Sequence, residues 1–181
     1  MRGLVVYESM FGCTRSIAEA ITQGLGSRMD VRLIRAAVVQ PEDLAELDFL
    51  GVGAPTHVHG LPRAATRRGT PDYLEKPGND LVLEPGADSD PGVREWLDNL
   101  GSLDLSGAAF DTRFHGSPLI TGRASKGISR TLVGRGAVMV LPVESFLVDK
   151  HGRLEAGEVE RARGWGVTLA GAVAERVTTS A

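Results

Sequence analysis

The sequence has little cysteine, little net charge and no long apolar segment. A single cysteine among 181 residues excludes an internal disulfide and is typical of a reducing compartment. The formal net charge of −3 provides no general attraction to nucleic acid. No apolar run approaches the roughly 20 residues that a membrane-spanning helix requires. We therefore expect neither a disulfide-stabilised protein, nor a nucleic-acid-binding protein, nor a transmembrane protein.

What the chain does contain is typical of one folded domain. Hydrophobic residues make up 42% and charged residues 24% of a chain long enough to bury a sizeable core. We expect a single domain over residues 1–181, with a surface insertion at about residues 67–90, which are rich in Gly, Pro and Asp. The first strand is expected to begin at residue 3 or 4, which leaves no room for a signal peptide. We therefore expect a cytoplasmic protein.

The most informative segment lies at the N-terminus. An apolar run at residues 4–7 is followed by a small polar loop at residues 9–14, and then by a helical pattern of Ile17, Ile21 and Leu25. A strand, a tight loop and a helix start in this order direct free backbone N–H groups and the positive end of the helix dipole at one point. A phosphate fits there without a lysine, and the hydroxyls at both ends of the loop can add donors.

The spacing within this loop distinguishes among known phosphate loops. A P-loop would require Gly, four residues and then Gly-Lys-Ser/Thr, and a dinucleotide loop would require G-x-G-x-x-G; neither is present. The loop resembles the flavodoxin phosphate loop, Ser/Thr-x-Thr-Gly-Asn-Thr, with matches at Ser9, Gly12 and Thr14. Phe11 replaces the usual threonine and Cys13 the usual asparagine, which removes polar side-chain contacts and leaves the backbone amides.

The rest of the chain alternates between strand and helix patterns. We expect further strands at residues 31–34, 48–53, 107–111 and 137–141, and helices at 91–100, 125–133 and 157–177, the first with Pro91 at its first position. This alternation predicts an α/β fold with a doubly wound, five-stranded parallel sheet. The resemblance to flavodoxins implies the strand order 2-1-3-4-5, with a ligand at the carboxyl ends of strands 1, 3 and 4. We expect the helices to bury Val93, Trp96, Leu97, Leu100, Ile128, Leu132, Val133, Val159, Ala162, Trp165, Leu169 and Val173.

Two loops follow the expected third and fourth strands, at residues 53–60 and 111–117. Both contain turn residues and polar groups. They resemble the flavodoxin loops that enclose the isoalloxazine ring, and residues 144–148 add to the likeness, which covers nearly the whole chain. The resemblance therefore implies a non-covalently bound FMN. The residues that it assigns to FMN are Ser9, Met10, Phe11, Gly12, Cys13, Thr14, Pro55, Thr56, His57, Val58, His59, Gly60, Asp111, Thr112, Arg113, Phe114, His115 and Gly116.

The charge expected around the flavin ring differs from that of a typical flavodoxin. Neither ring loop contains Trp or Tyr, and the loops and their edges carry several cationic or imidazole side chains. Positive charge stabilises a reduced, anionic flavin, so we predict a less reducing flavin than in an ordinary flavodoxin. The residues concerned are His57, His59, Arg63, Arg113, His115 and Arg123.

The resemblance favours an electron-transfer protein that serves redox partner proteins or small redox substrates. One alternative is an FMN-dependent oxidoreductase that uses NAD(P)H or a quinone-like or protoporphyrinogen-like substrate, as some proteins of this fold do. A second alternative is a flavin-free binding module, which Phe11 and Cys13 alone would support. No organic substrate and no catalytic residue is indicated by the sequence.

Several candidate residues also have simpler interpretations. His57 and His59 are two apart, a spacing that allows a shared metal, but two ligands are too few and no cluster of Cys or carboxylates completes a zinc site. Cys13 at a helix start is either a low-pKa, reactive thiol or a plain small side chain beside the phosphate. Ser9 and Thr14 are also able to cap the helix, and Asp111 is either a turn residue or a ring contact.

Overall fold

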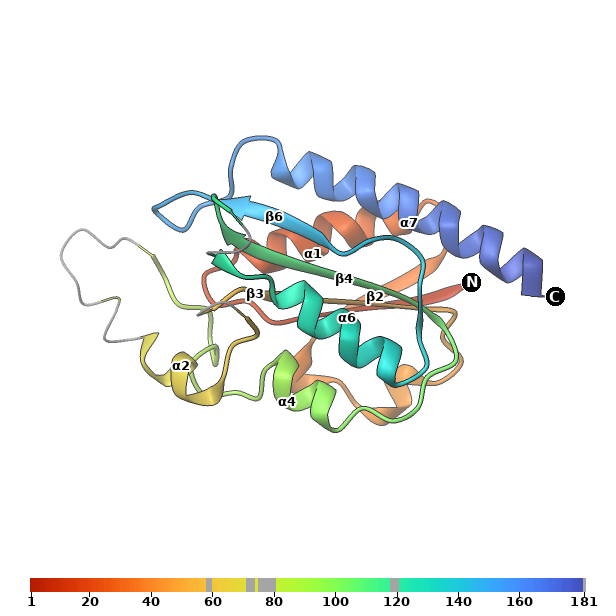
Figure 1. Cartoon of the computed structure of the whole chain (residues 1–181), viewed down its shortest axis with the longest axis horizontal. Helices are drawn as coiled ribbons and strands as arrows, with labels where there is room; N and C mark the ends of the chain where they lie inside the picture. The colour runs from red at the N-terminus through yellow and green to blue at the C-terminus, as the bar shows by residue number, and fades with distance from the viewer. Residues whose placement is uncertain (58–59, 71–73, 75–80, 118–120, 181) are drawn as a thin grey trace.

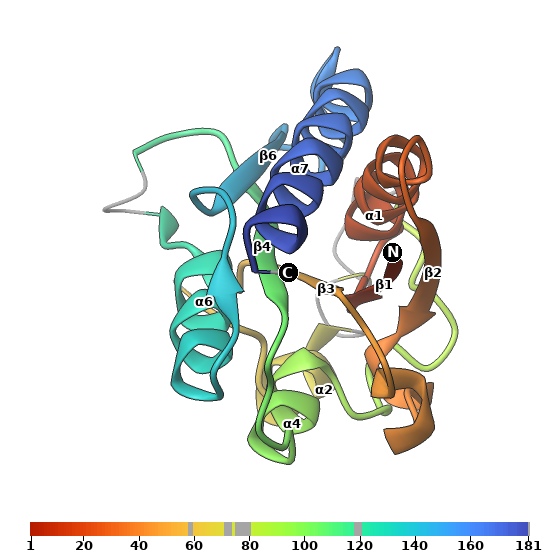
Figure 2. The ribbon, with the colours of Figure 1, turned by 90° about the vertical axis from the view of Figure 1, so that its right-hand side faces the viewer.

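The computed structural model describes residues 1–57, 60–70, 74, 81–117 and 121–180. The described residues form a six-stranded parallel sheet with helices on both of its faces (Figures 1 and 2). The strand order is β2-β1-β3-β4-β5, with β6 paired to β4, so the predicted doubly wound order is confirmed. The strands are β1 (Arg2–Tyr7), β2 (Asp30–Arg35), β3 (Phe49–Pro55), β4 (Ser106–Phe114), β5 (Val138–Met139) and β6 (Glu144–Val148).

Two helices cover one face of the sheet, and shorter helices cover the other (Figure 2). On the first face, α1 (Cys13–Leu25) packs against α7 (Glu158–Ser180). Their backbones approach closely at Gly24, where a Cβ would collide with the carbonyl of Arg163. The second face carries α2 (Ala64–Arg68), α4 (Val93–Asp98) and α6 (Ala124–Gly134), and two 3₁₀ segments, η1 (Ala36–Val38) and η2 (Pro41–Leu44), follow β2.

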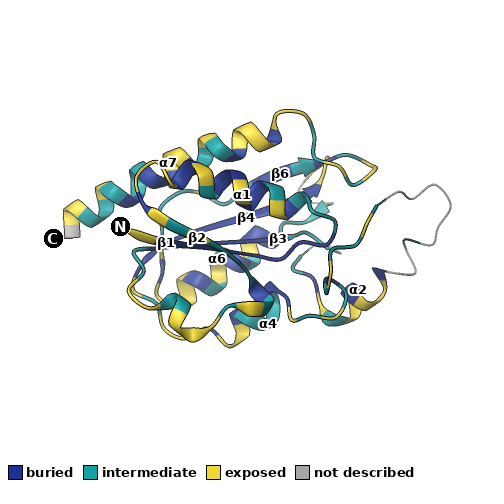
Figure 3. Cartoon of the chain, turned by 180° about the vertical axis from the view of Figure 1, so that it is seen from behind, coloured by how far each residue is buried: buried dark blue, intermediate teal, exposed yellow. Residues whose placement is uncertain are grey.

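The strands β1, β3 and β4 are buried between these helices, whose outer sides are exposed, while the edge strands β2 and β5 are only partly covered (Figure 3). The aromatic residues Phe110, Phe146 and Trp165 meet edge-to-face with centroid distances of 6.2–6.4 Å, which confirms Trp165 as a core residue. Two residues expected on buried helix faces are exposed instead, Val133 by 54% and Val159 by 39%. Each lies one position beside the apolar stripe of its helix. A step of one residue turns a helix by about 100°, which takes the side chain off the buried face.

The edge of the sheet beyond β4 differs from the expected single fifth strand. β5 pairs with the first residues of β4, Ser106 and Gly107, and β6 pairs with the last five, from Phe110 to Phe114. Pro142 lies between β5 and β6 and cannot donate a backbone hydrogen bond to a sheet, which explains the interruption. The sheet therefore has six strands rather than the five that were predicted.

Two boundaries were also predicted wrongly. β4 continues to Phe114, so Thr112 and Arg113 lie in a strand and not in a loop. Helix α4 begins at Val93 with Gly92 as its N-cap, so Pro91 precedes the helix. Within the described residues, none of the helices is both long and apolar enough to cross a membrane.

Candidate functional site

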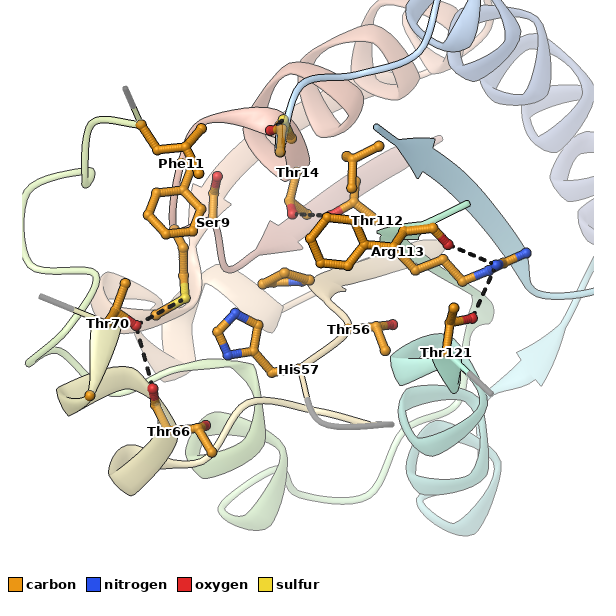
Figure 4. A pocket seen from close by; sticks show the side chains of 18 residues that line it. Ser9, Phe11, Thr14, Thr56, His57, Thr66, Thr70, Thr112, Arg113 and Thr121 are labelled. Atoms are coloured by element: carbon orange, nitrogen blue, oxygen red, sulfur yellow. Dashed lines mark hydrogen bonds between the residues drawn. The ribbon is translucent and has the colours of Figure 1, made fainter. Parts of the chain in front are cut away.

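A cavity of about 440 Å³ lies at the carboxyl ends of β1, β3 and β4 (Figure 4). This is where a doubly wound sheet places its ligands. The structure brings three predicted segments together there, and a volume of this size suits a small-molecule site. The predicted site residues that line the cavity are Ser9, Met10, Phe11, Cys13, Thr14, Pro55, Thr56, His57, Thr112, Arg113 and Phe114.

The loop at residues 9–14 has the geometry of an anion site. Gly12 has a φ of 90°, in the left-handed region that favours glycine, and its N–H donates to Ser9 Oγ over 3.1 Å. The first helical hydrogen bond runs from Ser16 N to Gly12 O, at 2.9 Å. The N–H groups of Cys13, Thr14 and Arg15 precede that bond and have no intrahelical acceptor. They are available to an anion at the start of α1.

The two hydroxyls of this loop do not cap α1. Its N-cap is Gly12, and no side chain makes a capping hydrogen bond there. Ser9 instead closes the loop on itself, and Thr14 Oγ1 shares a buried hydrogen bond of 2.7 Å with Thr112 Oγ1. The capping interpretation is therefore wrong, and the Thr14–Thr112 pair ties α1 to β4.

Cys13 is a neutral thiol in this site. Its Sγ lies 3.0 Å from the carbonyl oxygen of Gly152, to which it donates. Burial raises the pKa of Cys13 above its usual value, a backbone hydrogen bond at Leu154 opposes this shift, and the nearby carboxylates Asp149 and Glu84 raise the pKa further. The structure therefore favours the plain small side chain over the reactive thiol.

His57 projects into the cavity from the end of β3 (Figure 4). Its main chain exchanges two hydrogen bonds with Gly60, at 2.8 and 3.0 Å. Burial lowers the pKa of His57, and the Arg67 guanidinium lowers it further, so the neutral imidazole is favoured. Val58 and His59, also predicted to contact FMN, lie outside the described residues.

Arg113 lines the cavity but directs its hydrogen bonds at the protein. Its side chain is buried, and Nη1 donates to the carbonyls of Phe114 (3.1 Å) and Gly116 (2.9 Å) and to Thr121 Oγ1 (3.2 Å). Its Nε is buried without a hydrogen-bond partner among the described residues. Arg113 thus shapes the chain that follows β4 and brings a positive charge to the cavity wall.

Asp111, predicted to contact the ring, lies outside the cavity lining. It is fully buried, and its Oδ2 accepts a 2.8 Å hydrogen bond from Ser125 N in the first turn of α6. Thr56 Oγ1 accepts from the neighbouring Ala124 N over 2.9 Å. The two side chains satisfy orphan N–H groups of α6 and fix its start beside the cavity.

The structure places fewer of the predicted positive charges around the cavity than the sequence led us to expect. Of the six residues proposed for it, only His57 and Arg113 line the cavity within the described part of the chain, and His57 favours its neutral form. His115 is exposed and lies 3.0 Å from Glu155, and Arg63 is exposed at the start of α2. The predicted residues that do not line the cavity are Gly12, Gly60, Asp111, His115 and Gly116, and Arg63 and Arg123 lie outside it too.

The segment expected to be a peripheral insertion contributes to the site. Thr70, within it, is buried and lines the cavity, and its hydroxyl lies 3.4 Å from Thr66 O and 3.7 Å from Met10 Sδ. Farther along, Glu84 N donates to Met10 O over 2.8 Å. The lining residues that sequence patterns did not indicate are Thr66, Gly69, Thr70, Leu81, Thr121, Val148 and Gly152.

A buried charge network holds α2 against the rest of the site. Arg67 lies 3.5 Å from Glu8 and 2.9 Å from Glu95, and Glu8 Oε2 accepts from Val93 N at the start of α4 over 2.9 Å. Burial raises the pKa of Glu8, while the hydrogen bond from Val93 and the charge of Arg67 oppose the shift. Arg67 is thus a buried residue that joins β1, α2 and α4.

No protein-family model and no curated protein matches the chain. Solved structures do match it. A flavodoxin from the domain Archaea shares 20% of its residues, over 96% of this chain and 99% of that chain, with a TM-score of 0.64. Flavodoxin 1 from Bacillus cereus is 18% identical in sequence, over 94% of this chain and 98% of that chain, also with a TM-score of 0.64.

A larger protein contains a similar domain. The rubredoxin oxygen:oxidoreductase from Desulfovibrio gigas shares 16% of its residues over 97% of this chain but only 37% of its own length, with a TM-score of 0.61. At sequence identities this low, structural similarity shows that the folds are alike and nothing finer. Together with the parallel order β2-β1-β3-β4-β5, it shows that the chain has the flavodoxin-like fold.

Proposed function

We propose that the chain binds one FMN non-covalently in this cavity and transfers electrons between redox partners. One observation carries the proposal. Three segments that the flavodoxin resemblance assigns to FMN, at residues 9–14, 55–57 and 112–114, line the same cavity. Solved flavodoxins with the same fold support it.

The loop at residues 9–14 fits the phosphate of FMN. A phosphate can accept from the N–H groups at the start of α1, where the helix dipole favours negative charge. The two departures from the flavodoxin pattern leave this backbone intact. Cys13 directs its thiol to Gly152, and Phe11 lies at the wall of the cavity (Figure 4).

The other end of the cavity fits a flavin ring. Pro55, Phe114 and Val148 offer apolar surface, and the hydroxyls of Thr56 and Thr121 lie among them. FMN, when bound there, would supply one- and two-electron redox chemistry. The Arg113 guanidinium at the wall favours negative charge in the cavity, which supports a less reducing flavin than in an ordinary flavodoxin.

A second candidate is an FMN-dependent oxidoreductase. His57 favours it, since a neutral imidazole in the cavity can accept or donate the proton that two-electron chemistry requires. This candidate predicts that His57→Gln slows any NAD(P)H oxidation much more than it weakens FMN binding. In a one-electron carrier the same substitution would leave electron-transfer rates nearly unchanged.

The visible absorbance spectrum of the purified protein tests the proposal, recorded before and after FMN is added and the excess removed. A retained, protein-bound flavin spectrum would support it, and NAD(P)H oxidation would then separate a carrier from an oxidoreductase. A protein that retains no flavin in either state would overturn it in favour of the flavin-free binding module.

A further inference from the structure

A carboxylate lies against the loop that would hold the phosphate. Glu84 has a side chain only 10% exposed, and its Oε1 is 3.0 Å from Arg15 Nη1 in the first turn of α1. A Cβ placed on Gly12 would lie 3.8 Å from the same Oε1. The hydrogen bond from Glu84 N to Met10 O, 2.8 Å long, holds the main chain of Glu84 beside the loop.

The Glu84 carboxylate occupies a place that suits an anion. It lies where the α1 dipole and a guanidinium both favour negative charge. The contact with Arg15 is an ion pair without hydrogen-bond geometry, and Oε1 is buried without a hydrogen-bond partner among the described residues. A buried carboxylate oxygen in this position raises the cost of placing a second anion nearby.

The positive charge of Arg15 beside the loop is offset by nearby carboxylates and is therefore not free to attract a phosphate. Arg15 is half exposed and lies near two carboxylates, Glu84 at 3.0 Å and Glu19 at 3.8 Å. Burial raises the pKa of Cys13 and a backbone hydrogen bond at Leu154 lowers it, while the charges of Asp149 and Glu84 both raise it, so these two carboxylates act on the loop. Glu84 is much less exposed than Glu19 and its charge is therefore less screened by solvent.

We propose that Glu84 sets the selectivity of this site among flavins by opposing the phosphate of FMN and by engaging Arg15, so that the phosphate adds little affinity. The inference rests on the proposed FMN site. It predicts that the unmodified protein binds FMN and riboflavin, which lacks the phosphate, with dissociation constants within about tenfold of each other. One charge removed from a poorly solvated position near a phosphate is expected to change binding by about tenfold or more.

Flavin fluorescence titrations of the full chain, freed of any co-purified flavin, test this inference with FMN and riboflavin as probes. Glu84→Gln keeps the backbone contact with Met10 and is expected to tighten FMN binding by about tenfold or more while riboflavin binding changes by less than about twofold. The matched control is Glu19→Gln, which removes a half-exposed carboxylate near the same Arg15 and is expected to change both affinities by less than about twofold.

The outcomes separate this inference from the proposed function. If FMN binds the unmodified protein more than about 100-fold tighter than riboflavin, or if Glu84→Gln changes both flavins equally, the role of Glu84 is overturned and the FMN site stands. If neither flavin binds the unmodified protein or Glu84→Gln, the FMN site is overturned, and the role of Glu84 with it.

Discussion

The two ends of the cavity are built in different ways. The phosphate end consists of consecutive residues, 9–14, and depends on the backbone conformation of Gly12 and on the first turn of α1. The ring end combines residues far apart in the chain, with His57 after β3, Arg113 on β4 and Thr121 just before α6. Local backbone geometry makes the first end, and the packing of separate elements of the fold makes the second. The two ends should therefore respond differently to substitution.

The largest effect on flavin binding is expected from Gly12→Val at the phosphate end. A β-branched residue at a φ of 90° is strained by more than the roughly 1–2 kcal/mol typical of the left-handed region, and relief of that strain would redirect the loop N–H groups. Because Glu84 limits what the phosphate contributes, FMN affinity should fall by up to about tenfold, equivalent to about 1.4 kcal/mol, with a smaller loss for riboflavin. Flavin fluorescence titration measures both.

The matched control for Gly12→Val is Gly164→Ala in α7. A Cβ at Gly164 meets open space, so this substitution should leave flavin binding unchanged and stabilise the helix by up to about 1 kcal/mol. Equal losses of FMN and riboflavin affinity in Gly12→Val would show that the loop does not act through a phosphate.

Arg113→Gln tests the ring end and should have the next largest effect. Loss of hydrogen bonds to two carbonyls and a hydroxyl should destabilise the fold by about 2 kcal/mol, measured by urea unfolding. Loss of the charge should also make the flavin more reducing, by about 20–40 mV in a redox titration.

Arg113→Lys separates these two effects. It retains the charge but not the fork of hydrogen-bond donors, so it should destabilise the protein nearly as much while shifting the potential by less than half as far. A lysine variant with the full shift in potential would show that loop geometry, and not charge, controls the flavin.

The contact between the two ends is the buried hydroxyl pair of Thr14 and Thr112. Either Thr14→Val or Thr112→Val leaves the partner hydroxyl without its 2.7 Å hydrogen bond and should cost about 1 kcal/mol of unfolding free energy. The double variant should cost less than the sum, because both hydroxyls are then absent. Additive losses in urea unfolding would mean that the pair does not couple α1 to β4.

The smallest expected effect concerns His57 and pH. The folded state lowers the pKa of His57 and so favours its neutral imidazole. The resulting contribution to the free energy of unfolding is present above the unfolded-state pKa of about 6.5 and is lost as the pH falls below that pKa. His57→Gln should therefore flatten the fall in unfolding free energy between pH 7 and pH 5. The exposed His115→Gln is the control, and an equal flattening in that variant would contradict the assignment to His57.

The sequence predicted the architecture and the three segments that meet at the cavity, but not every residue of the cavity lining. Strand and helix periodicity identified the alternation, because each element must bury its apolar face against a neighbour. Asp111 was indistinguishable by sequence from a ring contact, yet it caps α6. No sequence pattern indicated Thr70. Its position in the cavity depends on α2, which the ion pairs of Arg67 with Glu8 and Glu95 hold in place.

The amino-acid sequence by itself determined the strand, loop and helix of residues 2–25, because a glycine with positive φ before an amphipathic helix is a local property of the chain. It also determined the apolar strands of the sheet. The tertiary structure alone decided which polar side chains face the cavity and that Glu84 lies beside Gly12. Burial and charge at those positions come from residues tens of positions apart, and sequence periodicity carries no record of such distant contacts.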